Sequence, residues 1–218
     1  MSLPLILLLL QALYQTVLMV LVSGAAGFLL GLPLGVLLFL TRPGQIQARP
    51  AFHRLLGLVI NAGRSVPFII LMVALIPLTR MLVGTSIGTA AAIVPLSLGA
   101  TPFVARLVEG ALMEVPAGLV EAARAMGARP GQIVCKVLLP EALPGILNAA
   151  TITLVTLVSY SAMAGVVGGG GLGDLGIRYG YQRFDAFVMA AVVVILILLV
   201  QVIQFLGERL VRRVNHRA

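Results

Sequence analysis

Long apolar runs separated by short polar clusters occupy most of the chain. Five of these runs are long enough to cross a bilayer as helices, because a hydrocarbon core of about 30 Å requires about 20 apolar helical residues. The runs are too long for strands, and their apolar positions do not alternate with polar ones. The pattern predicts an all-α polytopic membrane protein with five transmembrane helices, at approximately Thr16 to Leu40, Leu55 to Leu78, Ile87 to Val108, Ile146 to Val167 and Phe187 to Leu206.

Two stretches depart from a simple span. The N-terminal run Leu3 to Leu10 has no basic region before it and no small-residue cleavage site after it. We therefore expect it to be retained as a short interfacial helix that leads into the first span, and not to be a signal peptide. Asn61, Arg64 and Pro67 interrupt the first half of the second span, which makes it the least regular of the five.

Small residues mark one face of the first span. Gly27, Gly31 and Gly35 follow one another at intervals of four residues and therefore lie on the same side of a helix. Glycines in this arrangement allow the backbone of a neighbouring transmembrane helix to approach closely. The pattern predicts a tight helix contact in the bundle.

Composition agrees with a membrane protein. Of the 218 residues, 60% are apolar and 10% are charged, whereas soluble domains have about 45–50% apolar residues with glycine included and about 25% charged residues. The net charge of +8 could indicate nucleic-acid binding. The basic residues are not gathered with aromatic residues on one amphipathic face, so no nucleic-acid partner is expected.

The basic residues instead set the orientation in the membrane, because Lys and Arg concentrate in cytoplasmic loops. With the N-terminus outside, the outer loops contain only Arg80, Arg178 and Arg183. The inner segments then contain Arg42, Arg49, Arg54, Arg124, Arg129, Lys136, Arg209, Arg212, Arg213 and Arg217. The distribution predicts an outer N-terminus and a cytoplasmic C-terminus.

The chain lacks the groups that a membrane enzyme or a proton-coupled carrier requires. Its carboxylates are Glu109, Glu114, Glu121, Glu141, Asp174, Asp185 and Glu208, and none of them falls at the centre of a predicted span. Charged groups at that depth are costly and generally serve a function. The single Cys135 and the distant His53 and His216 give no metal-ligand spacing. The sequence predicts neither a proton relay nor a catalytic or metal site.

No nucleotide-binding motif is found either. Gly171, Gly173 and Gly176 match the spacing G-x-G-x-x-G, but no strand precedes them and no βαβ unit follows. The chain also has no phosphate-binding loop of the form G-x-x-x-x-G-K followed by Ser or Thr. If ATP energises transport, we expect ATP and Mg²⁺ to bind to a partner subunit.

The segment between the third and fourth spans, approximately residues 114–140, is too polar to cross lipid. Pro116 suits a first helical position and Gly127 suits a C-terminal cap, so a short helix is predicted between them. Leu119, Ala122, Ala123 and Met126 are expected to share one face, beside Glu121 and Arg124. From the pattern alone, such a helix could lie on the bilayer surface or dock against a protein partner.

This segment resembles the EAA loop of permeases of ABC importers, whose pattern is E-A-A-x3-G-x9-I-x-L-P. The matching residues are Glu121, Ala122, Ala123, Gly127, Leu139 and Pro140, and Val137 replaces the usual isoleucine. The resemblance implies that the segment forms a coupling helix that fits into a groove on an ATP-binding subunit. It also implies that residues 1–218 form a single transmembrane domain of the type I ABC class.

Further motifs resemble those of the methionine importer permeases over nearly the whole chain. They are residues 41–46 (TRPGQI), 64–68 (RSVPF), 79–80 (TR), 84–88 (GTSIG), 93–96 (IVPL), 160–165 (YSAMAG), 168–174 (GGGGLGD) and 180–184 (GYQRF). The resemblance implies uptake of methionine across a bacterial inner membrane. It also implies a second copy of this chain, a pair of ATP-binding cassette subunits, and a periplasmic substrate-binding protein or lipoprotein as partners.

The fourth span is the predicted lining helix of the pathway. Thr153, Thr156, Tyr160 and Met163 follow one another at intervals of three and four residues on one stripe. Hydroxyls on such a stripe could line water, and a flexible methionine could close a narrow passage. The same hydroxyls could instead bond to neighbouring backbone or helices. Arg64 and Arg106 could likewise be pathway residues or side chains that extend to the interface.

Three other functions are compatible with part of this pattern. The first is an ABC importer permease for another amino acid or a small solute, because an outer binding protein largely selects the substrate. The second is a secondary transporter driven by an ion gradient. The third is a membrane scaffold that transports nothing.

Overall fold

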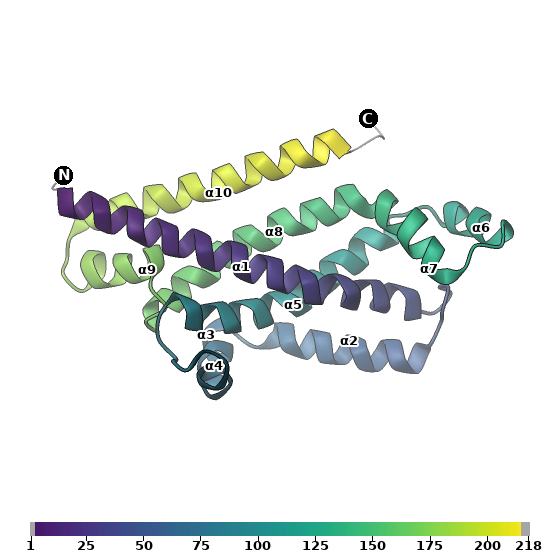
Figure 1. Cartoon of the computed structure of the whole chain (residues 1–218), viewed down its shortest axis with the longest axis horizontal. Helices are drawn as coiled ribbons and strands as arrows, with labels where there is room; N and C mark the ends of the chain where they lie inside the picture. The colour runs from purple at the N-terminus through teal and green to yellow at the C-terminus, as the bar shows by residue number, and fades with distance from the viewer. Residues whose placement is uncertain (1–2, 215–218) are drawn as a thin grey trace.

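The computed structural model describes residues 3–214 and contains only helices and connecting segments within that range (Figure 1). Arg217 and His216, which the sequence interpretation considered, lie outside the described residues. The α-helices are α1 (Leu3–Thr41), α2 (Pro50–Ser65), α3 (Phe68–Ala74), α4 (Ile76–Val83), α5 (Thr89–Met113), α6 (Ala117–Ala125), α7 (Pro130–Ile133), α8 (Leu139–Val166), α9 (Gly171–Leu175) and α10 (Ala186–Val214). Two π-helical segments, η1 (Val134–Leu138) and η2 (Gly176–Tyr181), continue from α7 and α9.

Four helical segments are long and apolar enough to cross a membrane, or five if the bent pair α2 and α3 counts as one span. They run roughly side by side along the long axis of the molecule (Figure 1). The start of α1 lies near α9 at one end of the bundle, and α6 and α7 lie at the opposite end. This arrangement agrees with the predicted polytopic, all-helical class.

Helix α1 is one continuous helix from Leu3. The predicted interfacial helix at Leu3 to Leu10 is therefore the first part of the same helix as the first span, with no break between them. A run of helix formers without glycine or proline connects the two parts, from Leu5 to Ser23. Leu9 in this first part and Ala12 just after it are buried in one cluster with Leu172 and Val188, so the start of α1 packs on the bundle.

The predicted glycine face of α1 is confirmed, and its neighbour is α5. A methyl group at Gly31 would lie 2.7 Å from the carbonyl oxygen of Thr101, and one at Gly35 would lie 2.6 Å from that of Ala105. Both contacts involve backbone, which cannot rotate away as a side chain can. Glycine is therefore required where α1 and α5 cross.

Gly35→Ala should destabilise the protein, because the added methyl forces the two helices apart and opens gaps along their interface. We expect a loss of about 1–3 kcal/mol, measured as a lower thermal unfolding temperature in detergent. Gly110→Ala on α5 is the matched control, since its methyl would meet no atom within 4 Å. Equal unfolding temperatures for the two variants would contradict the close packing of α1 on α5.

The second span differs from its prediction as a single helix over Leu55 to Leu78. Helix α2 ends at Ser65, Pro67 precedes α3, and the two axes are bent by 99°. Pro67 has no N–H for the helix and disfavours a helical conformation of Val66, whose ψ is 125°. The apolar run therefore folds as a broken segment followed by α4.

Two further boundaries differ from the sequence prediction. The helix of the fourth span begins before Ile146, since α7, η1 and α8 form one apolar helical stretch over Pro130–Val166. The segment expected as the last outer loop is largely helical, as α9 and η2. Its glycine run turns at Gly168, Gly170 and Gly171, all with positive φ. The side chains of Gln15 and Thr16 of α1 accept hydrogen bonds from the amides of Gly171 and Leu172, respectively.

Candidate functional site

Helix α6 lies at the end of the bundle, beyond α1 and α5 (Figure 1), and its C-terminus is capped. It begins directly after Pro116, one residue later than predicted. At its other end the amide of Gly127 donates to the carbonyl of Arg124 at 2.9 Å, and the amide of Ala128 donates to that of Ala123 at 3.1 Å. This is a Schellman cap, and Gly127 provides the left-handed residue that it needs, with a φ of 77°.

One face of α6 is buried in this chain. Val120 and Ala123 pack into a cluster with Phe39, Leu112 and Ile133, which come from α1, α5 and α7. Ala123 is only 3% exposed, so it does not lie on the exposed face that it was expected to share with Leu119, Ala122 and Met126. The burial joins α6 to three helices, so that a force on α6 is transmitted to them.

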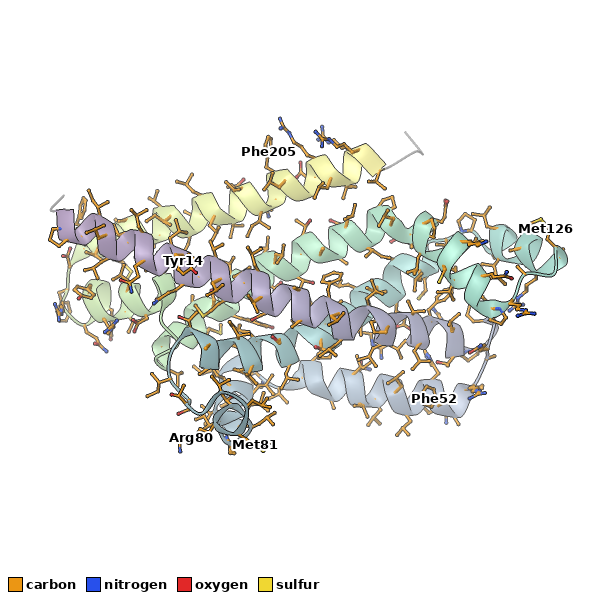
Figure 2. The ribbon with its side chains drawn as sticks, viewed as in Figure 1. Tyr14, Phe52, Arg80, Met81, Met126 and Phe205 are labelled. Atoms are coloured by element: carbon orange, nitrogen blue, oxygen red, sulfur yellow. The ribbon has the colours of Figure 1, made fainter. Side chains whose placement is uncertain are left out.

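The opposite face of α6 is open. Met126 is 80% exposed, Leu119 is 41% exposed, and Ala122 is also on the surface. Figure 2 shows the side chain of Met126 at the extreme end of the molecule. Glu121 is exposed beside them and forms no ion pair within the described residues. The surface of α6 therefore offers two large apolar side chains and a carboxylate, with a small alanine between them.

Leu139 and Pro140 lie where the helical stretch from α7 enters α8. Pro140 cannot donate a backbone hydrogen bond, and the stretch before it is π-helical, with the amide of Leu139 bonded to the carbonyl of Val134. The π-helical turn accommodates the missing donor without ending the helix. These two residues therefore connect the α6–α7 end to the long helix α8.

The four residues predicted to line a pathway lie in different environments. Thr153 is buried, and its hydroxyl donates to the carbonyl of Ala149 at 2.7 Å. The hydroxyl of Thr156 donates to the carbonyl of Ile152 at 2.8 Å. These two hydroxyls thus follow the alternative interpretation, in which they bond to backbone. Their bonds lie within α8 itself and do not join it to a neighbouring helix.

Tyr160 and Met163 face opposite neighbours of α8. The ring of Tyr160 stacks on that of Phe68 of α3, with centroids 4.5 Å apart and planes 3° apart. Met163 is 44% exposed and lines an open groove of about 640 Å³ between α8 and α10. Thr156 lines a second groove of about 490 Å³ between the same helices, closer to the α6 end. The predicted stripe therefore does not face one cavity within a single chain.

The sequence interpretation did not identify an ion pair within α5, or the hydrogen bonds by which its arginine contacts α2. Nη1 of Arg106 is 2.6 Å from Oε2 of Glu109, which is buried. The same guanidinium donates to Oδ1 of Asn61 and to the carbonyl of Gly57, each at 3.1 Å. The available sequence signal was the spacing of two opposite charges, three residues apart at the end of the third predicted span. The contact of Arg106 with α2 could not be predicted from that spacing.

The chain belongs to the family described as the binding-protein-dependent transport system inner membrane component, whose model matches residues 27–216. It is 65% identical over 210 residues to a probable D-methionine transport system permease protein MetI of Vibrio cholerae, covering 96% of this chain and 93% of the relative. It is 59% identical over 217 residues to the D-methionine transport system permease protein MetI of Escherichia coli, with 100% of both chains covered.

Solved structures of ABC transporter chains also resemble this chain. A chain of the MetNI methionine ABC transporter, described as inward facing, superposes with a TM-score of 0.98 at 59% identity, covering 99% of this chain and 100% of that chain. An amino-acid ABC transporter crystallised with histidines has a TM-score of 0.75 at 21% identity, over 94% of each chain. Because its identity is only 21%, this second similarity shows a shared fold and nothing further.

Proposed function

We propose that this protein is the permease subunit of an ATP-driven importer that moves methionine across the bacterial inner membrane. The observation that carries the proposal is the projecting helix α6, capped at Gly127, in a chain of the binding-protein-dependent transport family. The similarity to D-methionine permeases over the whole chain supports the substrate. The resemblance to a MetNI chain supports an ATP-binding partner that carries ATP and Mg²⁺.

In this proposal the open face of α6 docks on the ATP-binding subunit. Leu119 and Met126 provide apolar contact, Ala122 allows close approach, and Glu121 provides a charged anchor. Ala123 has an internal role and fixes α6 to the bundle. Leu139 and Pro140 pass the movement of this end into α8. Closure of two ATP-binding subunits would thereby move the spans of two permease copies.

Transport by this cycle requires that substrate and nucleotide favour different conformations. The TM-score of 0.98 to a chain of a transporter described as inward facing supports an inward-facing state for the described conformation. A periplasmic substrate-binding protein or lipoprotein would deliver methionine to the outward-facing state. Met163, exposed on α8 in the present conformation, would close the passage between the two copies.

Uptake by the reconstituted transporter tests the function. Proteoliposomes with this permease, its ATP-binding partner and the binding protein should accumulate labelled methionine only when ATP is supplied. Dissipating the proton and sodium gradients should leave uptake unchanged, whereas uptake by a secondary transporter would stop. Uptake without ATP, or preference for a different solute in competition with methionine, would contradict the proposal.

The native Cys135 reports the orientation that the proposal requires. It is exposed on η1, next to the α6 end, and is the single cysteine of the chain. If this end is cytoplasmic, a membrane-impermeant maleimide should label Cys135 in inside-out vesicles and leave it unlabelled in intact spheroplasts. Cys135→Ser gives the background in both preparations. Labelling from outside in sealed spheroplasts would place α6 on the wrong side for docking.

The role of Met163 can be tested separately. Met163→Ala shortens the side chain at the proposed closure and should raise substrate leak from loaded proteoliposomes, or basal ATP hydrolysis. Val166→Ala is a control on the same exposed side of α8, one turn away. A leak rate and a basal ATPase rate equal to those of the wild type in Met163→Ala would remove this residue from the pathway.

A further inference from the structure

Arg64 places an uncompensated positive charge deep in the membrane-spanning part of the molecule. It lies in the last turn of α2, 14 residues after Pro50, or about 21 Å along the helix axis at 1.5 Å per residue. Residues 3–214 provide no carboxylate partner for it. Charges at such depth pair with one another or face a water-filled cavity, and they commonly mark substrate pathways.

Arg106 differs from Arg64, because its guanidinium has polar partners within the chain. The guanidinium of Arg106 is occupied by Glu109, Asn61 and the carbonyl of Gly57. The guanidinium of Arg64 lies 5.8 Å from the ring centre of Phe103 and forms no comparable polar contacts. A planar fork of donors therefore remains available to a ligand.

Arg64 lines a cavity of about 180 Å³ at the break between α2 and α3. Its aromatic walls come from three other helices: Phe68 of α3, Phe103 of α5 and Tyr160 of α8. The stacking of Phe68 on Tyr160 fixes the position of two of these rings. The cavity therefore combines one cationic group with a preformed aromatic surface.

The broken helix also provides an acceptor. Gly63 lines the same cavity, and the residue four positions later is Pro67, which has no N–H to donate to the carbonyl of Gly63. Carbonyl groups at a helix C-terminus carry partial negative charge and attract cations. A carbonyl acceptor and a guanidinium donor therefore occur on adjacent residues.

We propose that this cavity is a subsite for a zwitterionic amino acid with an apolar side chain. Arg64 binds the α-carboxylate through paired hydrogen bonds, and the carbonyl of Gly63 accepts from the α-ammonium group. The rings of Phe68, Phe103 and Tyr160 contact the side chain, and a thioether packs favourably against aromatic rings. The inference rests on the proposed transport function and places a binding step inside the permease.

Photolabelling of the assembled transporter in nanodiscs tests the subsite. Photo-methionine, a diazirine analogue, should form adducts in peptides of this chain that contain residues 63–71, 99–103 or 160. Arg64→Gln should reduce this labelling by about tenfold or more, because it removes charge-assisted hydrogen bonds to the carboxylate. Arg54→Gln removes an exposed positive charge from the same helix and should leave the labelling unchanged.

A competition experiment on the wild-type protein needs no variant. Unlabelled methionine should suppress the adducts, and methioninol, which lacks the carboxylate, should not. Equal competition by the two compounds, adducts confined to the α8–α10 groove, or unchanged labelling in Arg64→Gln would each overturn the subsite. Failure of the wild-type proteoliposomes to accumulate methionine would instead refute the proposed function, so the two failures are distinguishable.

Discussion

Replacing Gly127 with valine is expected to lower substrate-stimulated ATP turnover by about five- to thirtyfold. The φ of 77° at Gly127 costs a side-chain-bearing residue about 1–2 kcal/mol, which corresponds to that change in the population of the correctly capped helix. Valine is preferred to aspartate for this test, since Asp and Asn tolerate positive φ better than a β-branched residue does. Loss of the cap would turn α6 away from the position required for docking.

Gly118→Ala is the matched control for this variant. Both glycines lie at the ends of the α6 segment, and an added methyl would meet no atom within 4 Å at either position. Gly118 is within the helix and has no positive φ, so alanine should be tolerated there. Steric effects are thereby separated from backbone strain. Normal coupling of ATP turnover to substrate in Gly127→Val, in a complex that assembles, would count against the docking role of α6.

The second large effect is expected at Glu109. Glu109→Ala removes the carboxylate from the partly buried guanidinium of Arg106, whose side chain is 23% exposed. Breaking a buried pair by removing one partner costs about 3–5 kcal/mol, because the remaining charge stays desolvated. We expect a large decrease in the thermal unfolding temperature, and weaker coupling because Glu109 no longer orients the guanidinium that donates to Asn61 and Gly57 of α2.

Two further variants identify the cause of that loss. Glu208→Ala breaks the ion pair of Glu208 with Arg212, in which the side chain of Glu208 is 69% exposed and that of Arg212 is 82% exposed. An exposed ion pair on one helix contributes only about 0.3–0.5 kcal/mol. The double variant Arg106→Met with Glu109→Leu removes both charges and should recover much of the stability. If the double variant were no more stable than Glu109→Ala, altered packing and not an unpaired charge would be the cause.

The position of this ion pair suggests why it matters for transport. Helix α5 leads through Met113 and Val115 directly to α6, and Arg106 attaches α2 to that helix. Movement of α6 would therefore carry α2 as well as α5. The free end of α2 holds Arg64 and the proposed subsite, so the ion pair lies between the docking surface and the substrate.

Much of the architecture could be predicted from local patterns. Apolar length identified the membrane-spanning helices, because the bilayer thickness sets the number of apolar residues needed. The four-residue glycine spacing identified the contact face of α1, because helix periodicity alone places those residues together. Gly127 was identified as a cap because few other residues accept its conformation. These features depend on neighbours along the chain or on the solvent.

Other features depend on which helices meet. The sequence does not say that Ala123 faces its own bundle, since several faces of a short amphipathic helix are compatible with its composition. Nor does it separate Arg64 from Arg106, which are both single arginines in apolar runs. Only the tertiary structure brings Glu109 and Asn61 to one of them and an aromatic cavity to the other.

The sequence by itself determined the membrane-spanning class, the helical segments, the close-contact face and the capped helix, because each follows from hydrophobic length or from backbone geometry over a few residues. The tertiary structure alone decided the break of the second span into two helices 99° apart, the burial of one side of α6 and the separation of the pathway residues. Such outcomes depend on the packing of distant segments, which competes with local preference and is not encoded at any single position.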